Sequence, residues 1–91
     1  MIKQAHIFYS GQVQGVGFRF TAERIALDLK LIGWVKNLTD GRVEVALEGE
    51  EEEIKIFLNN IRDVMRIHIQ KEDVQWEPAS GKFKDFEIRF R

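Results

Sequence analysis

The stretch Gly11–Arg19, which reads GQVQGVGFR, separates a β-strand pattern from a helix pattern. Its glycines, Gly11, Gly15 and Gly17, permit left-handed backbone conformations and let successive N–H groups turn toward one point. A loop that ends at a helix N-terminus also points the positive end of the helix dipole at that place, and Arg19 adds a guanidinium. The stretch therefore predicts a site for a small tetrahedral anion such as phosphate.

The residues on either side of this loop have the periodicities of a strand and a helix. Ala5–Val13 alternates with a period of two, which is typical of a half-buried strand. From Phe18 onward the apolar residues recur at the spacing of one helix face. Trp34–Asn37 follows as a short strand, and Asp40-Gly41 is a strong hairpin-turn signal before a returning strand over Val43–Leu47.

The second half of the chain repeats the order of helix and strand. We expect Gly49 to end the third strand and Glu50–Glu53 to begin a second helix, because carboxylates are favoured at the positive end of the dipole. A fourth strand is predicted within His68–Glu77, with Val74 and Trp76 facing the core. The apolar face of the second helix comprises Ile54, Phe57, Leu58, Ile61 and Met65.

A last strand is indicated where Phe86, Ile88 and Phe90 alternate with charged residues. The element order is then β-α-β-β-α-β-β, and its first six members form the split βαβ arrangement. The sequence predicts an α+β fold. We expect a ferredoxin-like βαββαβ sandwich with a four- to five-stranded antiparallel sheet and two helices on one face.

The size and composition of the chain limit its class and its partners. Its 91 residues predict a single domain over residues 1–91. A net charge of −1 gives no basic field for nucleic acid, and no apolar run reaches the length of a membrane span. Cysteine is absent, which is consistent with a reducing compartment. We therefore expect a cytoplasmic protein, a monomer by default, without a nucleic-acid or membrane partner.

Two motifs together resemble the signatures of the acylphosphatase family. Gly11–Arg19 meets every defined position of G-x-V-Q-G-V-x-F-R, and Gly33–Glu44, which reads GWVKNLTDGRVE, matches G-W-V-x-N-x-x-D/N-G-x-V-E. The resemblance covers almost the whole chain. It departs at Asp63–His68, where family members often carry Gly-Pro, so the shape of that segment stays open.

The resemblance implies hydrolysis of acyl phosphates to a carboxylate and inorganic phosphate, with phosphate as product and inhibitor. It implies direct attack by water and neither a metal nor another cofactor. Arg19 would hold the phosphate oxygens, and Asn37 would orient the attacking water. The remaining phosphate contacts would come from the backbone N–H groups of Gln14, Gly15, Val16, Gly17 and Phe18. An acyl phosphate has a stable leaving group, so the absence of a thiol or a Ser-His-Asp set is compatible with this chemistry.

Other interpretations of the same residues stay open at this point. Arg19 alone is also compatible with a helix-surface charge, and Asn37 alone with a turn-initiating residue. The alternative function is that of a ferredoxin-like binding module. This would be either an RNA-recognition domain or a small-molecule regulatory domain. Residues Gly15–Phe20 faintly resemble the RNA-recognition motif. Acylphosphatase-like domains also occur at the N-terminus of a large hydrogenase-maturation carbamoyltransferase. The last predicted strand ends at Phe90-Arg91, and this favours a free-standing protein.

Overall fold

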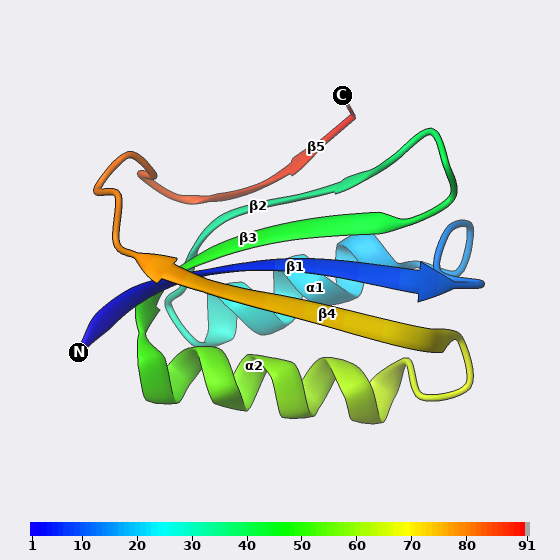
Figure 1. Cartoon of the computed structure of the whole chain (residues 1–91), viewed down its shortest axis with the longest axis horizontal. Helices are drawn as coiled ribbons and strands as arrows, with labels where there is room; N and C mark the ends of the chain where they lie inside the picture. Colours follow the sequence, from blue (N-terminus) through cyan, green and yellow to red (C-terminus); the bar gives the residue numbers. More distant parts are fainter. Residues whose placement is uncertain (91) are drawn as a thin grey trace.

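The computed structural model describes residues 1–90 and shows two helices packed on one face of a five-stranded sheet (Figure 1). In chain order the elements are β1 (Ile2–Gly11), α1 (Phe18–Asp28), β2 (Ile32–Asn37), β3 (Val43–Glu50), α2 (Glu51–Val64), β4 (Ile69–Pro78) and β5 (Phe86–Arg89). This order confirms the predicted ferredoxin-like fold. Neither helix in this part of the chain combines the length and the apolar character that crossing a membrane requires.

The strands lie in the order β4-β1-β3-β2-β5. The pairs β1–β3, β1–β4 and β2–β3 are antiparallel, as expected, but β5 pairs with β2 in parallel. The sheet is therefore mixed rather than wholly antiparallel. Figure 1 shows the reason: β4 ends at the end of the sheet where β2 begins, so a chain that crosses that end enters β5 in the direction of β2.

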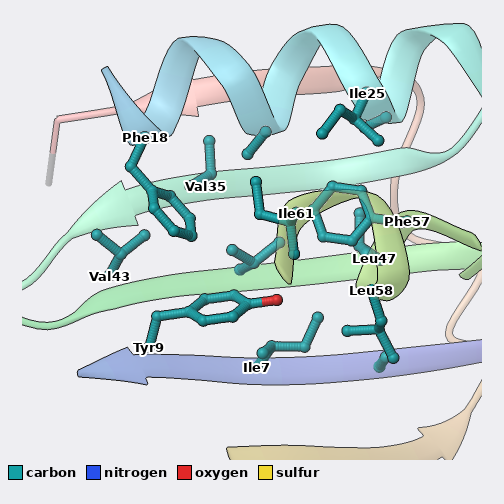
Figure 2. Packing of buried hydrophobic residues seen from close by; sticks show 14 of the residues in the cluster. Ile7, Tyr9, Phe18, Ile25, Val35, Val43, Leu47, Phe57, Leu58 and Ile61 are labelled. Carbon is teal, nitrogen blue, oxygen red and sulfur yellow. The ribbon is translucent and has the colours of Figure 1, made fainter. Parts of the chain in front are cut away.

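The core lies between the sheet and the two helices. Alternate residues of β1 and β3 point into it, and Phe18 extends from the start of α1 beside Tyr9, with ring centroids 4.9 Å apart (Figure 2). Burying one such side chain stabilises the fold by about 1.5–3 kcal/mol. The burial of Phe18 therefore fixes where α1 begins, and with it the position of the loop before the helix. Other fully buried core residues are Ile7, Val13, Val35, Val43, Val45, Leu47, Ile54, Phe57 and Ile61.

Three expectations about individual strand residues need correction. Gly49 does not end the third strand, because it pairs with Lys3 of β1 and β3 continues to Glu50. Trp76 shares the inward face of Val74 but is 40% exposed, because β4 is an edge strand that α2 only partly covers. Phe90 lies beyond the end of β5 and is 77% exposed.

The connection between β4 and β5 is held by a carboxylate of β3. Glu48 of β3 is buried and accepts hydrogen bonds from the Ser80 N–H at 2.8 Å, the Ser80 hydroxyl at 2.9 Å and the Gly81 N–H at 2.9 Å. Burial raises the pKa of Glu48, but these hydrogen bonds outweigh it and leave the pKa below its usual range. Glu48 is therefore a structural anchor.

Candidate active site

The loop that follows β1 is fixed at its first residues by the connection between α2 and β4. Gly11 has a φ of 121°, and a Cβ there would lie 2.5 Å from the carbonyl oxygen of His68 and 2.8 Å from the Gln70 nitrogen. The Gln12 N–H donates a hydrogen bond of 3.0 Å to the same His68 carbonyl. Gly11 is thus required for close packing, and the segment from Asp63 to His68, which departs from the family pattern, supports the loop through its last residue.

The loop ends at an N-terminus of α1 that has no side-chain cap. Gly17 is the N-cap residue, in the left-handed conformation with φ 79° and ψ 18°, and no side chain caps the helix. The first turn contains no acidic residue. Since the first N–H groups of a helix have no intrahelical acceptor, this end carries positive partial charge and free donors.

Loop, helix and sheet converge on one small cavity of about 190 Å³. Its lining comprises Val13, Gly15, Gly17, Phe18, Arg19, Phe20 and Asn37. The structure thus brings together Arg19 and Asn37, which the sequence placed in separate motifs. Of the other predicted site residues, Gly15, Gly17 and Phe18 line the cavity. Gln14 and Val16 lie outside the lining, and the side chain of Val16 packs against the core.

The side chain of Gln14 has a structural role. Its Nε2 donates hydrogen bonds to the carbonyl oxygens of Leu38 at 2.7 Å and Arg42 at 2.9 Å. These two acceptors flank the turn between β2 and β3, so Gln14 ties the loop to the hairpin that carries Asn37. The order Val-Gln-Gly places an amide side chain in the loop, but a single sequence does not reveal its partners.

Asn37 is the last residue of β2, where it pairs with Val43 of β3. The turn begins after it: the Leu38 N–H donates to the Arg42 carbonyl at 2.8 Å. Asp40 accepts from the Arg42 backbone N–H at 3.1 Å and from its Nε at 2.9 Å, and these bonds lower the pKa of Asp40. Asp40 therefore closes the turn, while Asn37 stands on the sheet at the wall of the cavity.

Arg19 is held beside the cavity by a residue from the far end of the chain. Its Cζ lies 5.0 Å from the ring centroid of Phe90, within the range of a cation–π interaction. Phe90 and Asn37 also line a larger adjoining cleft of about 670 Å³, together with residues of the β2–β3 turn. The small cavity combines a guanidinium, a helix N-terminus and a carboxamide, and its lining contains no carboxylate. Such a lining suits an oxyanion.

Comparison with known proteins agrees with this geometry. The family model described as Acylphosphatase matches residues 5–88. The chain belongs to the acylphosphatase family. The acylphosphatase of Geobacillus thermodenitrificans is 41% identical over 89 residues, covering 91% of this chain and 93% of that protein. The crystal structure of acylphosphatase from Bacillus subtilis superposes with a TM-score of 0.88 at 33% identity, covering 99% of this chain and all of that one.

A longer protein contains a similar unit. The crystal structure of T. kodakarensis HypF matches with a TM-score of 0.83 and 34% identity, covering 98% of this chain but only 12% of that chain. The RNA-recognition alternative is not favoured. Gly15–Phe20 lies in the loop and the first turn of α1 rather than on a central strand, and Phe18 is buried where it cannot stack on a base.

Proposed function

We propose that this acylphosphatase-family chain hydrolyses acyl phosphates by direct attack of water on phosphorus. Water forms a new P–O bond, and the bond between phosphorus and the acyl oxygen breaks. The electron pair leaves with the carboxylate, and a proton of the water passes to a phosphate oxygen. The observation that carries the proposal is that Gly15, Gly17, Arg19 and Asn37 line the same cavity.

In this proposal the phosphoryl group occupies the small cavity. Arg19 binds two of its oxygens, because a planar guanidinium matches an oxyanion in a way that an ammonium does not. Backbone N–H groups from Gln14 to Phe18 complete the contacts, and the free N-terminus of α1 favours the negative charge. These groups neutralise charge that develops in the transition state.

Asn37 orients the attacking water in line with the departing carboxylate. A carboxamide can accept from the water and donate to a phosphate oxygen at the same time. The leaving carboxylate is stable without a proton, so the chemistry requires positioning and charge neutralisation rather than a strong nucleophile. We assign no metal or other cofactor to this reaction.

We further propose that residues 1–91 form one domain that works as a monomer in the cytoplasm, without a nucleic-acid or membrane partner. Support comes from the net charge of −1 and the lack of cysteine. Size-exclusion chromatography with light scattering tests the monomer, which a mass of two chains at micromolar concentration would contradict.

Hydrolysis of benzoyl phosphate in the presence of EDTA tests the reaction itself. We expect turnover that inorganic phosphate inhibits competitively. In ¹⁸O-labelled water the label should enter phosphate and not benzoate, because water attacks phosphorus. Label in the benzoate would place the attack on the carbonyl carbon, and an absence of turnover would refute the proposed function.

A further inference from the structure

The cavity has room for the phosphoryl half of a substrate and little more. Its volume is about 190 Å³. A phosphoryl group and an attacking water take up much of that space. An acyl group larger than acetyl must therefore extend from the cavity and lie against its rim. The apolar residues at the rim then determine which acyl groups gain contact energy.

One apolar side chain in the lining is available for such contact. Val13 and Phe18 are 0% and 2% exposed, so their surfaces are already used by the core. Phe20 also lines the cavity and is 66% exposed. Because Phe20 belongs to the cavity lining and is largely exposed, its ring forms part of the rim against which a projecting acyl group can lie.

Phe90 is the other exposed phenyl group near Arg19, but its ring already contacts the guanidinium. Phe20, by contrast, has no aromatic or cationic partner among residues 1–90. A single exposed phenylalanine is ordinary on a protein surface. Here it stands at the mouth of a site whose substrates differ only in the part that projects outward.

We propose that Phe20 contacts the acyl half of the substrate and makes this chain prefer acyl phosphates with aromatic or large apolar acyl groups. This inference rests on the proposed function. The aromatic ring of a benzoyl group and the Phe20 ring can stack in offset or edge-to-face geometry, whereas an acetyl group is too short to cover the ring. Phe20 is thus a specificity residue, distinct from the groups that hold phosphate.

The test compares kcat/KM for benzoyl phosphate and acetyl phosphate in the wild type, Phe20→Ala and Leu27→Ala. Leu27 is a matched control because it is a 54% exposed apolar residue on the same helix but outside the cavity lining. We expect Phe20→Ala to lower kcat/KM for benzoyl phosphate about two- to tenfold, the value of one aromatic contact. Its effect on acetyl phosphate and on inhibition by phosphate should be below about twofold, and Leu27→Ala should change neither substrate.

A benzoyl-to-acetyl ratio that is the same in the wild type and Phe20→Ala, with both substrates hydrolysed, would overturn the inference and leave the proposed function standing. A wild type that hydrolyses neither substrate would overturn the proposed function as well. Phe20→Trp provides a second test. The larger ring should keep or raise the benzoyl-to-acetyl ratio of kcat/KM. A fall in this ratio as large as that of Phe20→Ala would contradict a contact between residue 20 and the acyl group.

Discussion

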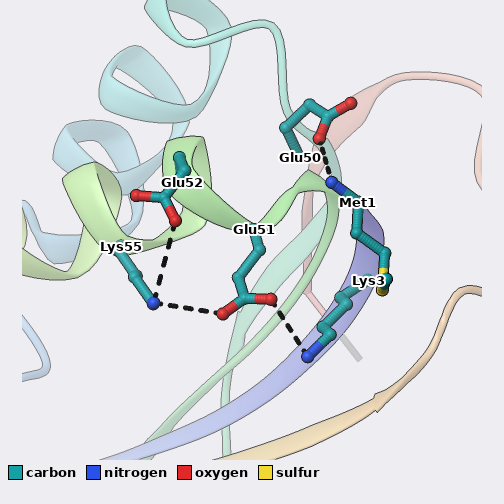
Figure 3. A network of polar contacts seen from close by, with 6 residues as sticks. All are labelled: Met1, Lys3, Glu50, Glu51, Glu52 and Lys55. Atoms are coloured by element: carbon teal, nitrogen blue, oxygen red, sulfur yellow. Dashed lines mark hydrogen bonds and ion pairs between the residues drawn. The ribbon is translucent and has the colours of Figure 1, made fainter.

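The N-termini of the two helices differ in whether the chain itself places negative charge there. The first turn of α2 contains Glu51, Glu52 and Glu53, and Glu51 pairs with Lys3 at 3.0 Å and Lys55 at 3.1 Å (Figure 3). The first turn of α1 has no acidic residue. It has a glycine cap and an arginine instead. Carboxylates of the chain thus occupy the positive end of one helix, and the positive end of the other is left for a ligand.

This difference has an energetic meaning. A cation in the first turn opposes the helix dipole and costs about 0.3–1 kcal/mol at an exposed site. The dipole therefore disfavours Arg19 in the absence of an anion, and the cation–π contact with Phe90, worth about 0.5–1 kcal/mol at an exposed site, offsets a cost of that size. A bound phosphate makes the electrostatic energy of this helix end favourable, because the anion interacts with both the helix dipole and the guanidinium. The same helix physics thus stabilises the fold at α2 and binds the substrate at α1.

Removing the guanidinium from the N-terminus of α1 should have the largest effect on activity. We expect Arg19→Ala to lower kcat/KM by about 10³-fold or more and to abolish inhibition by phosphate, because it removes a charged pair of donors. Arg24→Ala, an exposed arginine of the same helix, is the control and should retain activity within about twofold. Since the dipole and cation–π effects offset each other, thermal unfolding of Arg19→Ala should match the wild type without phosphate. Phosphate should raise the Tm of the wild type alone.

A substitution of Asn37 distinguishes the positioning of the attacking water from the binding of the anion. Asn37→Ala should lower kcat by about 10²–10³-fold, the usual cost of losing one oriented polar group at a reacting centre. The inhibition constant of phosphate should change little, because the anion is held from α1 and the loop. If KM rose while kcat stayed constant, Asn37 would be a binding residue and the water would be positioned by another group.

Gln14 tests whether the loop and the β2–β3 hairpin must be held together. Gln14→Leu removes the hydrogen bonds to the Leu38 and Arg42 carbonyls and should destabilise the fold by about 1–3 kcal/mol. We also expect kcat to fall about tenfold with phosphate inhibition retained, since a misplacement of Asn37 by a fraction of an ångström is costly. A variant that unfolds more easily but keeps the wild-type kcat in the cold would limit Gln14 to a structural role.

Much of this arrangement was predictable from the sequence, because its causes are local. Periodicity indicated both helices, and the Asp40-Gly41 turn and the glycine loop follow from backbone conformation. The partners of Gln14 and Glu48 could not be predicted, because they are set by contacts between segments 24 or more residues apart. The parallel pairing of β5 depends in the same way on the path of a connection. Phe90 continued the strand alternation, but it lies beyond the end of β5, where its ring is exposed and contacts the Arg19 guanidinium.

An acidic residue in the first turn of α1 would make the two helix N-termini alike. Phe20→Glu should raise the inhibition constant of phosphate about two- to fivefold relative to Phe20→Gln, because the new carboxylate competes for the same dipole. The glutamate variant should also unfold at a slightly higher temperature than the glutamine variant. Both differences should vanish when the pH is low enough to protonate the glutamate. Equal inhibition constants at neutral pH would mean that the dipole of α1 contributes nothing to anion binding.

Neutralising an acid of α2 should have the smallest effect and none on catalysis. The hydrogen bonds from Lys3 and Lys55 hold the pKa of Glu51 below its usual range. Because the folded pKa lies below the unfolded one, Glu51 contributes stability that is present above the unfolded pKa and is lost as the pH falls through the folded pKa. Glu51→Gln should therefore lower the Tm slightly at neutral pH and low salt, and the difference should shrink in acid or high salt. Glu52→Gln, which loses only a contact of 3.8 Å to Lys55, is the control and should do less. A change in phosphate inhibition in either variant would show that the charges of α2 reach the cavity, and the two helix ends would no longer be independent.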